Sequence, residues 1–338
     1  MKKAKFFAPF DKERGSVKCV LCSHGCIVES GKRGLCGVRE NHEGVLYSLV
    51  YGNLVALNID PIEKKPLFHF FPGSLSFSIA TKGCNFRCRH CQNATISQVI
   101  RDEGLDLSHS YSPEQIVGVT IRTGCKSISY TYTEPTVFLE FALDTAILAR
   151  QKGIKNVFVS NGYTSEEATR AIVPYLDANN IDLKGDDGFY KSICGARLQP
   201  VLDTIKMMKD ANVWVEVTTL IIPTLNDSEE FLQWAADFIR SVDPAMPWHI
   251  TRFHPTYKLT HIPPTPLETL QKAREIGLRT GLKYVYTGNV PGDGGEHTYC
   301  PECKRVVIER VGFTVRGIYI KDSRCTYCGY TIDGVGLP

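Results

Sequence analysis

The stretch Lys82–Asn93 reads KGCNFRCRHCQN and places Cys84, Cys88 and Cys91 in one short segment. It follows an apolar run that is typical of a strand, and Gly83 separates the two. The cysteines fall at i, i+4 and i+7, which would also suit one face of a helix. The residues between them are Asn, Arg, His and Gln, however, and these would not support a core helix. We therefore interpret the segment as a metal-binding loop after a strand.

Three thiols are one fewer than a closed metal site requires. Structural zinc sites take four protein ligands, and a [4Fe-4S] cluster needs four cysteines for full thiolate ligation. Three cysteines would leave one iron of such a cluster open. The missing ligand therefore leaves room for a substrate or a cofactor.

The chain contains thirteen cysteines, which is many for a reducing compartment, where closely spaced thiols more often bind metal than form disulfides. Two of them, Cys125 and Cys194, stand apart and are expected to be small buried apolar residues. The other eleven form three groups: Cys84, Cys88 and Cys91; Cys19, Cys22, Cys26 and Cys36; and Cys300, Cys303, Cys325 and Cys328.

The composition is that of an ordinary globular protein, with 43% hydrophobic and 22% charged residues among 338. The formal net charge is only +3, so neither a nucleic-acid surface nor an anionic-membrane surface is indicated. No apolar run reaches the roughly 18 residues of a membrane span, and no signal-peptide pattern is found. The expected location is the cytoplasm.

From Ser74 onward, short β-branched runs alternate with longer helical stretches. The helical stretches carry Ser, Thr, Asp or Pro at their starts and Gly or Asn at their ends, as capped helices do. At least six consecutive β-α units predict an α/β fold with a parallel sheet, closed as a full (β/α) TIM-like barrel or left as a partial one. An open doubly wound sheet is the alternative. The strand-like runs are SLSFSIAT, SISYTYT, NVFVS, NIDLK, VWVEVTTLII, WHITRF and KYVYTG.

Two smaller regions flank this pattern, so we expect three parts: residues 1–73, 74–296 and 297–338. The first is a Cys-rich region of loops with a hairpin predicted over residues 45–60, where Gly52 and Asn53 give a turn signal. The last is a small module in which strand-like runs flank two C-x-x-C pairs.

The C-x3-C-x2-C loop after the first strand resembles the signature of the radical SAM superfamily. SYTYTEPT, VSNGY, NIDLKG, VTTLIIPTLND and ITRFHPTYK occur at strand ends in the order seen in pyruvate formate-lyase activating enzyme and its relatives. The N-terminal cysteines, DPIEKKPLFHFFPG and the C-terminal pairs resemble one branch of that group, the radical SAM proteins of the AmmeMemoRadiSam system. The resemblance covers nearly the whole chain. It implies a [4Fe-4S] cluster on Cys84, Cys88 and Cys91, with S-adenosylmethionine at the open iron.

The resemblance also implies which residues hold that cofactor. Glu134 matches the acid that binds the methionyl amino group, and an acid at a helix N-terminus is the alternative reading. Lys184 is expected near the methionyl carboxylate and beside Asp182. The alternative is that Asp182 and Lys184 form an ordinary ion pair on the surface. The remaining candidates contact the ribose, the adenine or the nucleoside: His90, Ser160, Asn161, Ile222 and His254.

The flanking cysteine groups predict further metal sites. The C-terminal pairs have zinc-ribbon spacing and are expected to hold zinc or iron in a structural role. The N-terminal four, whose spacing is less regular, suit either zinc or a second iron–sulfur cluster, and His24 and His42 are alternative ligands.

Three functions follow as hypotheses. The first is a radical SAM enzyme that abstracts hydrogen from an unidentified substrate, with an electron donor such as flavodoxin or ferredoxin and with Memo-like and AMMECR-type partner proteins. The second is an activase that acts on a glycine of a partner protein. The third is a zinc-ribbon adaptor without catalysis, which would have no use for the three-cysteine loop and would need a basic face.

Overall fold

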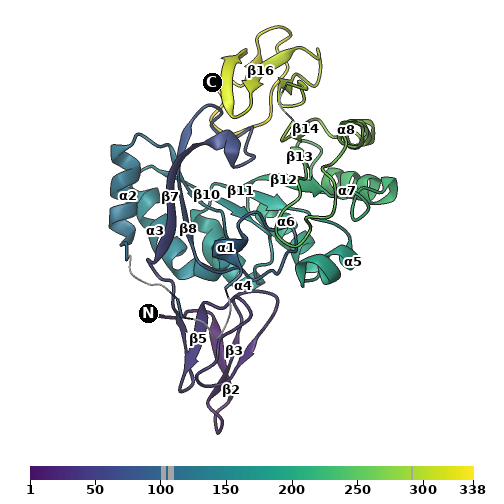
Figure 1. Cartoon of the computed structure of the whole chain (residues 1–338). Helices are drawn as coiled ribbons and strands as arrows, with labels where there is room; N and C mark the ends of the chain where they lie inside the picture. The colour runs from purple at the N-terminus through teal and green to yellow at the C-terminus, as the bar shows by residue number, and fades with distance from the viewer. Residues whose placement is uncertain (100–103, 106–109, 291) are drawn as a thin grey trace.

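The computed structural model describes residues 1–99, 104–105, 110–290 and 292–338. Its centre is an eight-stranded sheet with the strand order β14-β13-β12-β11-β10-β9-β8-β7 (Figure 1). The strands are β7 (Leu54–Pro61), β8 (Leu75–Thr81), β9 (Ser127–Tyr130), β10 (Lys155–Ser160), β11 (Ala178–Asp182), β12 (Trp214–Ile221), β13 (Trp248–Arg252) and β14 (Val285–Gly288).

The seven strands from β8 to β14 are parallel, and each pairs with the next along the chain. This confirms the predicted α/β fold with a mostly parallel sheet. A doubly wound sheet would reverse its strand order at one point, and this order does not reverse. Among the described residues, β14 and β7 form the two edges and do not pair, so the sheet is open rather than a closed barrel.

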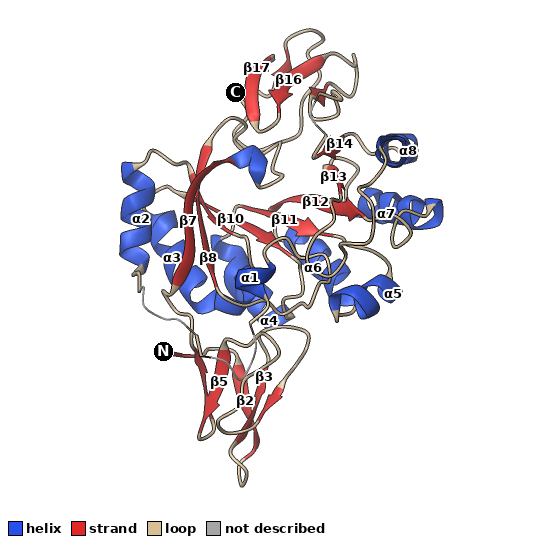
Figure 2. Ribbon diagram, in the orientation of Figure 1, coloured by secondary structure: helices blue, strands red, loops and turns tan. Residues whose placement is uncertain are grey.

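Helices connect the parallel strands, as Figure 2 shows. Ser112, Ser165 and Ser228 each accept a hydrogen bond from the first turn of a helix, as the capping pattern predicted. No helix in the described ranges combines the length and apolar character needed to cross a bilayer. The helices are α1 (Ala94–Ser97), α2 (Pro113–Arg122), η2 (Pro135–Phe138), α3 (Leu139–Gln151), α4 (Glu166–Ile172), η3 (Val173–Tyr175), α5 (Asp187–Phe189), η4 (Tyr190–Cys194), α6 (Gln199–Asp210), α7 (Glu229–Val242) and α8 (Leu267–Thr280).

The N-terminal region forms two small sheets at one end of the molecule (Figure 1). One contains β2 (Phe7–Asp11), β3 (Ser16–Cys19) and β4 (Ile27–Val28); the other contains β1 (Lys2–Lys3), β6 (Val45–Ser48) and β5 (Arg39–His42).

The hairpin expected over residues 45–60 is not formed. β6 pairs instead with β5, around the turn at Glu43 and Gly44, and β7 pairs antiparallel with β8. β7 is therefore an edge strand of the main sheet, which begins before the boundary expected at 73/74. The physical reason is that β8 (Leu75–Thr81) is a longer pairing partner for β7 than β6 (Val45–Ser48) would be.

The C-terminal region lies at the opposite end of the molecule (Figure 1). It contains a three-stranded sheet of β15 (Thr298–Tyr299), β16 (Val306–Val311) and β17 (Thr314–Ile318), and the pair β18 (Ile320–Lys321) and β19 (Arg324–Cys325). It is joined to the segment after η1 (Ile62–Lys64), because Phe71 N–H donates to the Val335 carbonyl and Val335 N–H to the His69 carbonyl, each at 2.8 Å.

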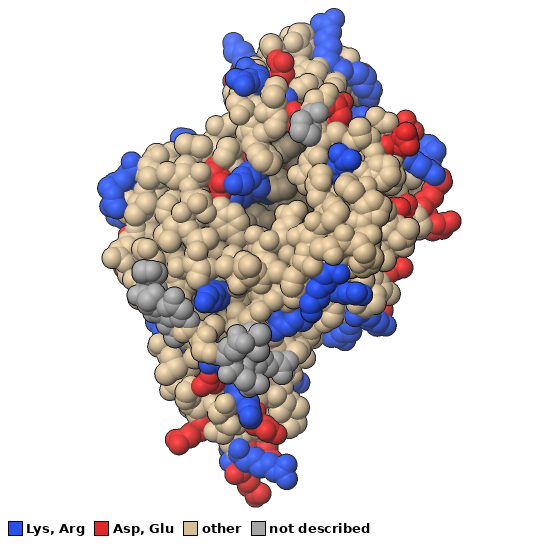
Figure 3. Space-filling model, in the orientation of Figure 1, with Lys and Arg blue, Asp and Glu red and all other residues tan. Residues whose placement is uncertain are grey.

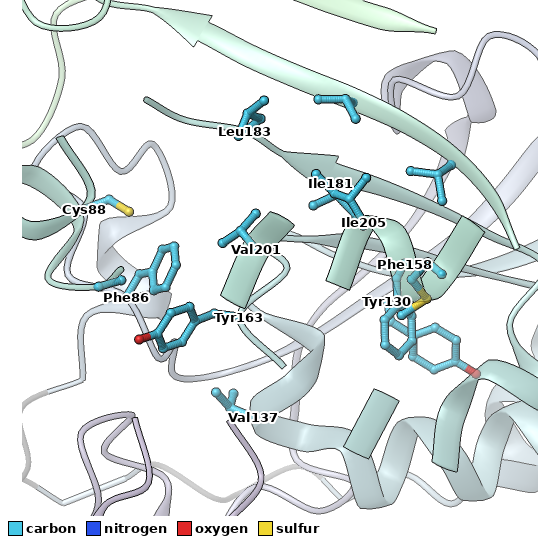
Figure 4. Packing of buried hydrophobic residues seen from close by; sticks show 14 of the residues in the cluster. Phe86, Cys88, Tyr130, Val137, Phe158, Tyr163, Ile181, Leu183, Val201 and Ile205 are labelled. Atoms are coloured by element: carbon cyan, nitrogen blue, oxygen red, sulfur yellow. The ribbon is translucent and has the colours of Figure 1, made fainter. Parts of the chain in front are cut away.

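The core continues from the helices to the cysteine loop. Phe86 is buried, and its ring lies edge-on to that of Tyr163 with centroids 5.2 Å apart. Figure 4 shows Cys88 and Phe86 at the margin of this packed cluster. The loop is thus held by apolar packing on one side, which leaves its thiols to face the other.

A buried carboxylate organises the inner face of the sheet. Glu216 on β12 is fully buried and accepts hydrogen bonds from the backbone N–H groups of Phe68 (3.0 Å) and His69 (2.8 Å). It also accepts from Trp214 Nε1 (2.9 Å) and lies 2.6 Å from His249 Nε2. Burial opposes its ionisation, but His249 and the other donors lower the pKa of Glu216 below its usual value. The carboxylate therefore fixes the segment after η1 against the sheet.

Replacing Glu216 with Gln should lower the free energy of unfolding at neutral pH by about 1–3 kcal/mol, because a buried donor would then face an amide N–H₂ group. The lowered pKa means that the stabilisation is complete above the unfolded pKa of about 4.3 and is lost as the pH falls below it. Urea unfolding of both proteins should therefore show a difference that shrinks on acidification. Glu229→Gln, which removes a carboxylate from an exposed ion pair with Lys272, is the control and should leave stability unchanged. A difference that grows with acidification would contradict the assignment.

Candidate active site

A cavity of about 610 Å³ opens at the carboxyl edge of the parallel strands. Figure 3 shows the hollow in the middle of this face, with charged side chains at its rim. Its walls come from the loops after β8, β9, β10 and β11, from the segment before β8, and from Phe313 of the C-terminal region. Six of the eight residues expected around the cofactor line it together with the three cysteines: His90, Glu134, Ser160, Asn161, Asp182 and Lys184.

The cysteine loop is held in place by its backbone. Arg87 N–H donates to the Cys194 carbonyl at 2.8 Å, and Arg89 N–H donates to the Ile193 carbonyl at 3.0 Å. These bonds tie the loop to η4. Cys194, expected to be a small apolar residue, is buried there with its thiol hydrogen-bonded to that of Cys88.

The three thiols fit a cluster better than a single ion. They line one cavity. Among the described residues, only the C-terminal cysteines bring all their sulfurs within 4.8 Å of one another, so the sulfurs of this loop are spread more widely. In a [4Fe-4S] cluster each thiolate binds a different iron, so such wider spacing is required. Burial raises the pKa of Cys84 and Cys91, so a metal must displace their protons. The hydrogen bond with Cys194 and the charge of Lys184 lower the pKa of Cys88.

Glu134 joins two strand ends. Its Oε1 accepts from Thr136 N–H (3.0 Å) and Ser160 Oγ (2.9 Å), and its Oε2 accepts from Asn161 N–H (2.8 Å). The side chain therefore caps η2 and also lines the cavity, and it is buried rather than solvated. Burial raises its pKa. Asn161 in turn reaches the cysteine loop, with Nδ2 3.8 Å from Cys84 Sγ.

Asp182 and Lys184 form an ion pair inside the cavity, with Oδ2 and Nζ 2.7 Å apart. The side chain of Lys184 is 15% exposed, so a plain surface pair is excluded. Burial opposes its charge, but Asp182 and the thiols of Cys88 and Cys194 raise the pKa of Lys184 well above its usual value. A permanent cation therefore lies beside the cysteine loop.

His90 stands between two cluster cysteines and is buried. Its Nδ1 has no hydrogen-bond partner within the described part of the chain, and its ring centroid lies 5.9 Å from that of Phe189. Burial and the charge of Lys184 lower its pKa to about 3, so the imidazole is neutral. A neutral ring with one unsatisfied nitrogen suits a polar aromatic ligand.

The structure does not bring Ile222 and His254 to this cavity. Ile222 is buried, and its backbone N–H donates to Asn226 Oδ1 at 2.6 Å. His254 is exposed, because the chain turns after β13 and buries the neighbouring Phe253 instead. His249 and Thr251, which lie at alternate positions within β13, line the cavity in its place.

A charged cluster at the wall of the cavity was not predicted. Asp60 Oδ2 lies 2.7 Å from Lys65 Nζ and accepts from Tyr132 OH, and Lys65 Nζ lies 4.6 Å from the centre of the Tyr132 ring. Burial disfavours the charge of Asp60, but the bonds from Lys65, Tyr132 and Lys64 together lower its pKa. Two lysines share the Asp60 carboxylate, and Glu63, which lies 3.6 Å from Arg310, lines the same cavity. The run DPIEKKP was the available signal.

The four C-terminal cysteines form a compact site. All four sulfurs lie within 4.8 Å of one another, and the pairs Cys300–Cys328 and Cys303–Cys325 are each 3.7 Å apart. A tetrahedral ion with metal–sulfur bonds of about 2.3 Å separates its ligands by about 3.8 Å, so the spacing suits one such ion. The N-terminal Cys19, Cys22, Cys26 and Cys36 line a small cavity of their own, with His24 beside them and His42 apart from it.

Comparison with known proteins agrees with this geometry. The family model described as the radical SAM superfamily matches residues 78–235, which contain the cysteine loop, part of β8 and strands β9 to β12. The chain is 49% identical, over 98% of its length and 99% of the relative's, to an uncharacterized protein of Methanocaldococcus jannaschii. It is 26% identical, over 48% of its length and 68% of the relative's, to the pyruvate formate-lyase-activating enzyme of Clostridium pasteurianum.

Among solved structures, a radical SAM methyltransferase from Sphaerobacter thermophilus is similar in fold. It has a TM-score of 0.51 and 14% identity, and the match covers 65% of this chain and 68% of that one. The matched segment, the strand order and the cysteine loop lead to one conclusion: the chain belongs to the radical SAM superfamily.

Proposed function

We propose that the protein is a radical SAM enzyme that abstracts hydrogen from a substrate bound in the 610 Å³ cavity. The observation that carries the proposal is that three cluster thiols, a buried carboxylate and a buried ammonium group line the same cavity. When bound there, a [4Fe-4S] cluster and S-adenosylmethionine supply a reductively formed 5′-deoxyadenosyl radical.

The chain's own residues position the cofactor. S-adenosylmethionine carries an ammonium and a carboxylate, and in a poorly hydrated site each needs a partner of opposite sign. Glu134 and Lys184 provide one carboxylate and one ammonium on the cysteine side of the cavity. Asn161 and Ser160 fix the Glu134 carboxylate, so its orientation does not depend on the ligand.

The part of the cavity lined by Lys65, Tyr132, His249 and Phe313 is left for the substrate. The ammonium groups of Lys64 and Lys65, which share the Asp60 carboxylate, favour a substrate with an anionic group. The burial of Lys65 keeps this charge poorly screened by water.

The activase hypothesis is the second candidate. It is supported by the partial similarity to a pyruvate formate-lyase-activating enzyme. It requires the mouth of the cavity to admit a glycine-bearing loop of a partner protein. The adaptor hypothesis is disfavoured because it gives no role to the buried ion pair Asp182–Lys184 next to three thiols.

We further propose zinc for the C-terminal site, flavodoxin or ferredoxin as electron donor, and Memo-like and AMMECR-type proteins as partners in the cytoplasm. The zinc proposal is supported by the sulfur spacing of 3.7 Å, and the others rest on the sequence resemblance.

Replacing Cys84, Cys88 and Cys91 together with Ala should remove about four irons per chain and abolish 5′-deoxyadenosine formation, because no thiolate is left to hold the cluster. Iron analysis and chromatography of anaerobic reactions measure both. Cys125→Ala removes a buried thiol far from this loop and should change neither quantity. Reductive cleavage of S-adenosylmethionine by the triple variant would refute the proposed function.

Replacing Lys184 with Met should weaken S-adenosylmethionine binding by about 1–3 kcal/mol while iron content stays the same, because a charged hydrogen-bond donor is lost beside an intact cysteine loop. Calorimetric or equilibrium-dialysis titration of the iron-loaded protein gives the affinity. Lys191→Met, which breaks an exposed pair with Asp187, is the matched control. Equal affinities in both variants would mean that Lys184 does not contact the cofactor.

Replacing Cys328 with Ser should lower zinc content and melting temperature together. Cys328 is exposed, so its thiol adds little packing, and any stability lost reflects the metal. S-adenosylmethionine cleavage by the folded fraction should persist. A well-folded variant that keeps its zinc but loses cleavage would contradict a structural role.

A further inference from the structure

The four N-terminal cysteines converge on one small cavity although they are dispersed over three turns of the chain. Cys19 ends β3, Cys22 and Cys26 flank the next turn, and Cys36 precedes β5. We propose that they hold a second iron–sulfur cluster, which lies directly against the loop of Cys84, Cys88 and Cys91 and passes electrons to it. The electron-transfer part of this proposal rests on the proposed function.

The spacing of the thiols distinguishes a cluster from zinc. Within the described ranges, only the C-terminal cysteines bring all their sulfurs within 4.8 Å of one another, so the N-terminal four are spread more widely. A single tetrahedral ion needs sulfurs about 3.8 Å apart. Thiolates that bind separate irons of one cluster stand further apart. The N-terminal four therefore lack the compact sulfur spacing of the C-terminal four, as ligands of separate irons would.

A buried and unsatisfied N–H group at the same cavity points to an occupant that accepts hydrogen bonds. Arg39 is 1% exposed and pairs with Glu140 through its terminal nitrogens, at 2.9 and 2.5 Å. Its Nε is buried and has no hydrogen-bond partner among the residues that the structure describes, and Arg39 lines the cysteine cavity. An unsatisfied N–H at this place is suited to a cluster sulfide or a cysteine thiolate, which accept hydrogen bonds.

The N-terminal cysteines pack directly on the radical SAM loop. Gly83 has φ +97°, and a Cβ added there would lie 2.6 Å from Val38 Cγ1 and 3.0 Å from the Cys36 carbonyl oxygen. On the other side of the loop, His24 Nε2 lies 2.8 Å from the carbonyl oxygen of Asn85, the neighbour of Cys84. Asn85 also lines the N-terminal cavity. Asn85 therefore borders the N-terminal cavity and is also the neighbour of the first thiol of the loop.

This contact makes the N-terminal site an entry point for electrons. A reduced one-electron carrier of the flavodoxin or ferredoxin class would lose one electron to the N-terminal cluster. That electron would pass to the group held by Cys84, Cys88 and Cys91. No bond is made or broken and no proton moves, and the carrier is oxidised by one electron for each electron delivered.

The first experiment counts metals in two complementary variants prepared without oxygen. The Cys84/Cys88/Cys91→Ala variant should retain iron and sulfide in about a one-to-one ratio, with an iron–sulfur EPR signal after reduction. The Cys22→Ala/Cys26→Ala variant should lose the iron that the first variant retains, while it keeps the zinc of the C-terminal site. Cys125→Ala is the matched control for the loss of a buried thiol.

A first variant with no iron–sulfur signal, or wild-type protein with two zinc ions per chain, would overturn the proposal. Because the first variant leaves the N-terminal thiols intact, this holds even if the second variant does not fold. Failure of the proposed function gives a different result, namely S-adenosylmethionine cleavage that survives the loss of Cys84, Cys88 and Cys91.

The second experiment tests electron entry by rapid-freeze EPR. In the Cys22→Ala/Cys26→Ala protein, reduced flavodoxin should reduce the remaining cluster at least tenfold more slowly than in wild type, while the small reductant dithionite should reduce it in both. Equal rates with flavodoxin would overturn the electron-transfer role.

Discussion

The site depends on one constraint, which is that seven neighbouring strands run parallel in the order of the sequence. Parallel strands in this order present all their carboxyl ends at the same edge. The loop after β8 brings thiols, the loops after β9 and β10 bring Glu134 and Asn161, and β11 brings the Asp182–Lys184 pair. These loops and strand ends are far apart in the sequence, and the sheet makes them neighbours.

The inner face of the sheet is polar, and its charges are compensated within the protein. Glu216 fixes the segment after η1, and Asp60 fixes Lys65 and Tyr132 at the cavity wall. Buried charges that lose a partner are strongly destabilising, so these pairs also determine where the segments can lie. The cavity walls are therefore defined by electrostatics as much as by apolar packing.

The sequence was most informative where the signal is local. Period-two and helical patterns, caps such as Ser112 and the cysteine spacing depend on neighbouring residues, and they predicted the parallel sheet and three groups of thiols. The pairing of β7 with β8 could not be read in this way, because a short apolar run does not reveal which partner it takes. The contact of Cys194 with Cys88 and the Asp60 cluster are formed by segments far apart in the chain.

The directions of side chains in the loops beyond the strand ends could not be predicted from the sequence either. His254 and Phe253 are adjacent, and a small change in the turn after β13 would exchange which of them is exposed. Alternation within a strand is fixed by the pleat, however, so the inward position of His249 was in principle predictable from its spacing to Thr251. The loops of the site thus carry less sequence information than the strands that support them.

Phe313 lies late in the sequence but lines the same cavity as the cysteine loop, and this has a consequence for biosynthesis. The cysteine loop and the strands that carry Glu134 and Lys184 are synthesised well before the C-terminal region that contributes Phe313 to the same cavity. On the ribosome, N-terminal parts of a chain fold first, so a half-built cavity stands open on this side while the last residues emerge. Docking of the C-terminal region then closes this side of the cavity last, after the cysteine loop is already in place.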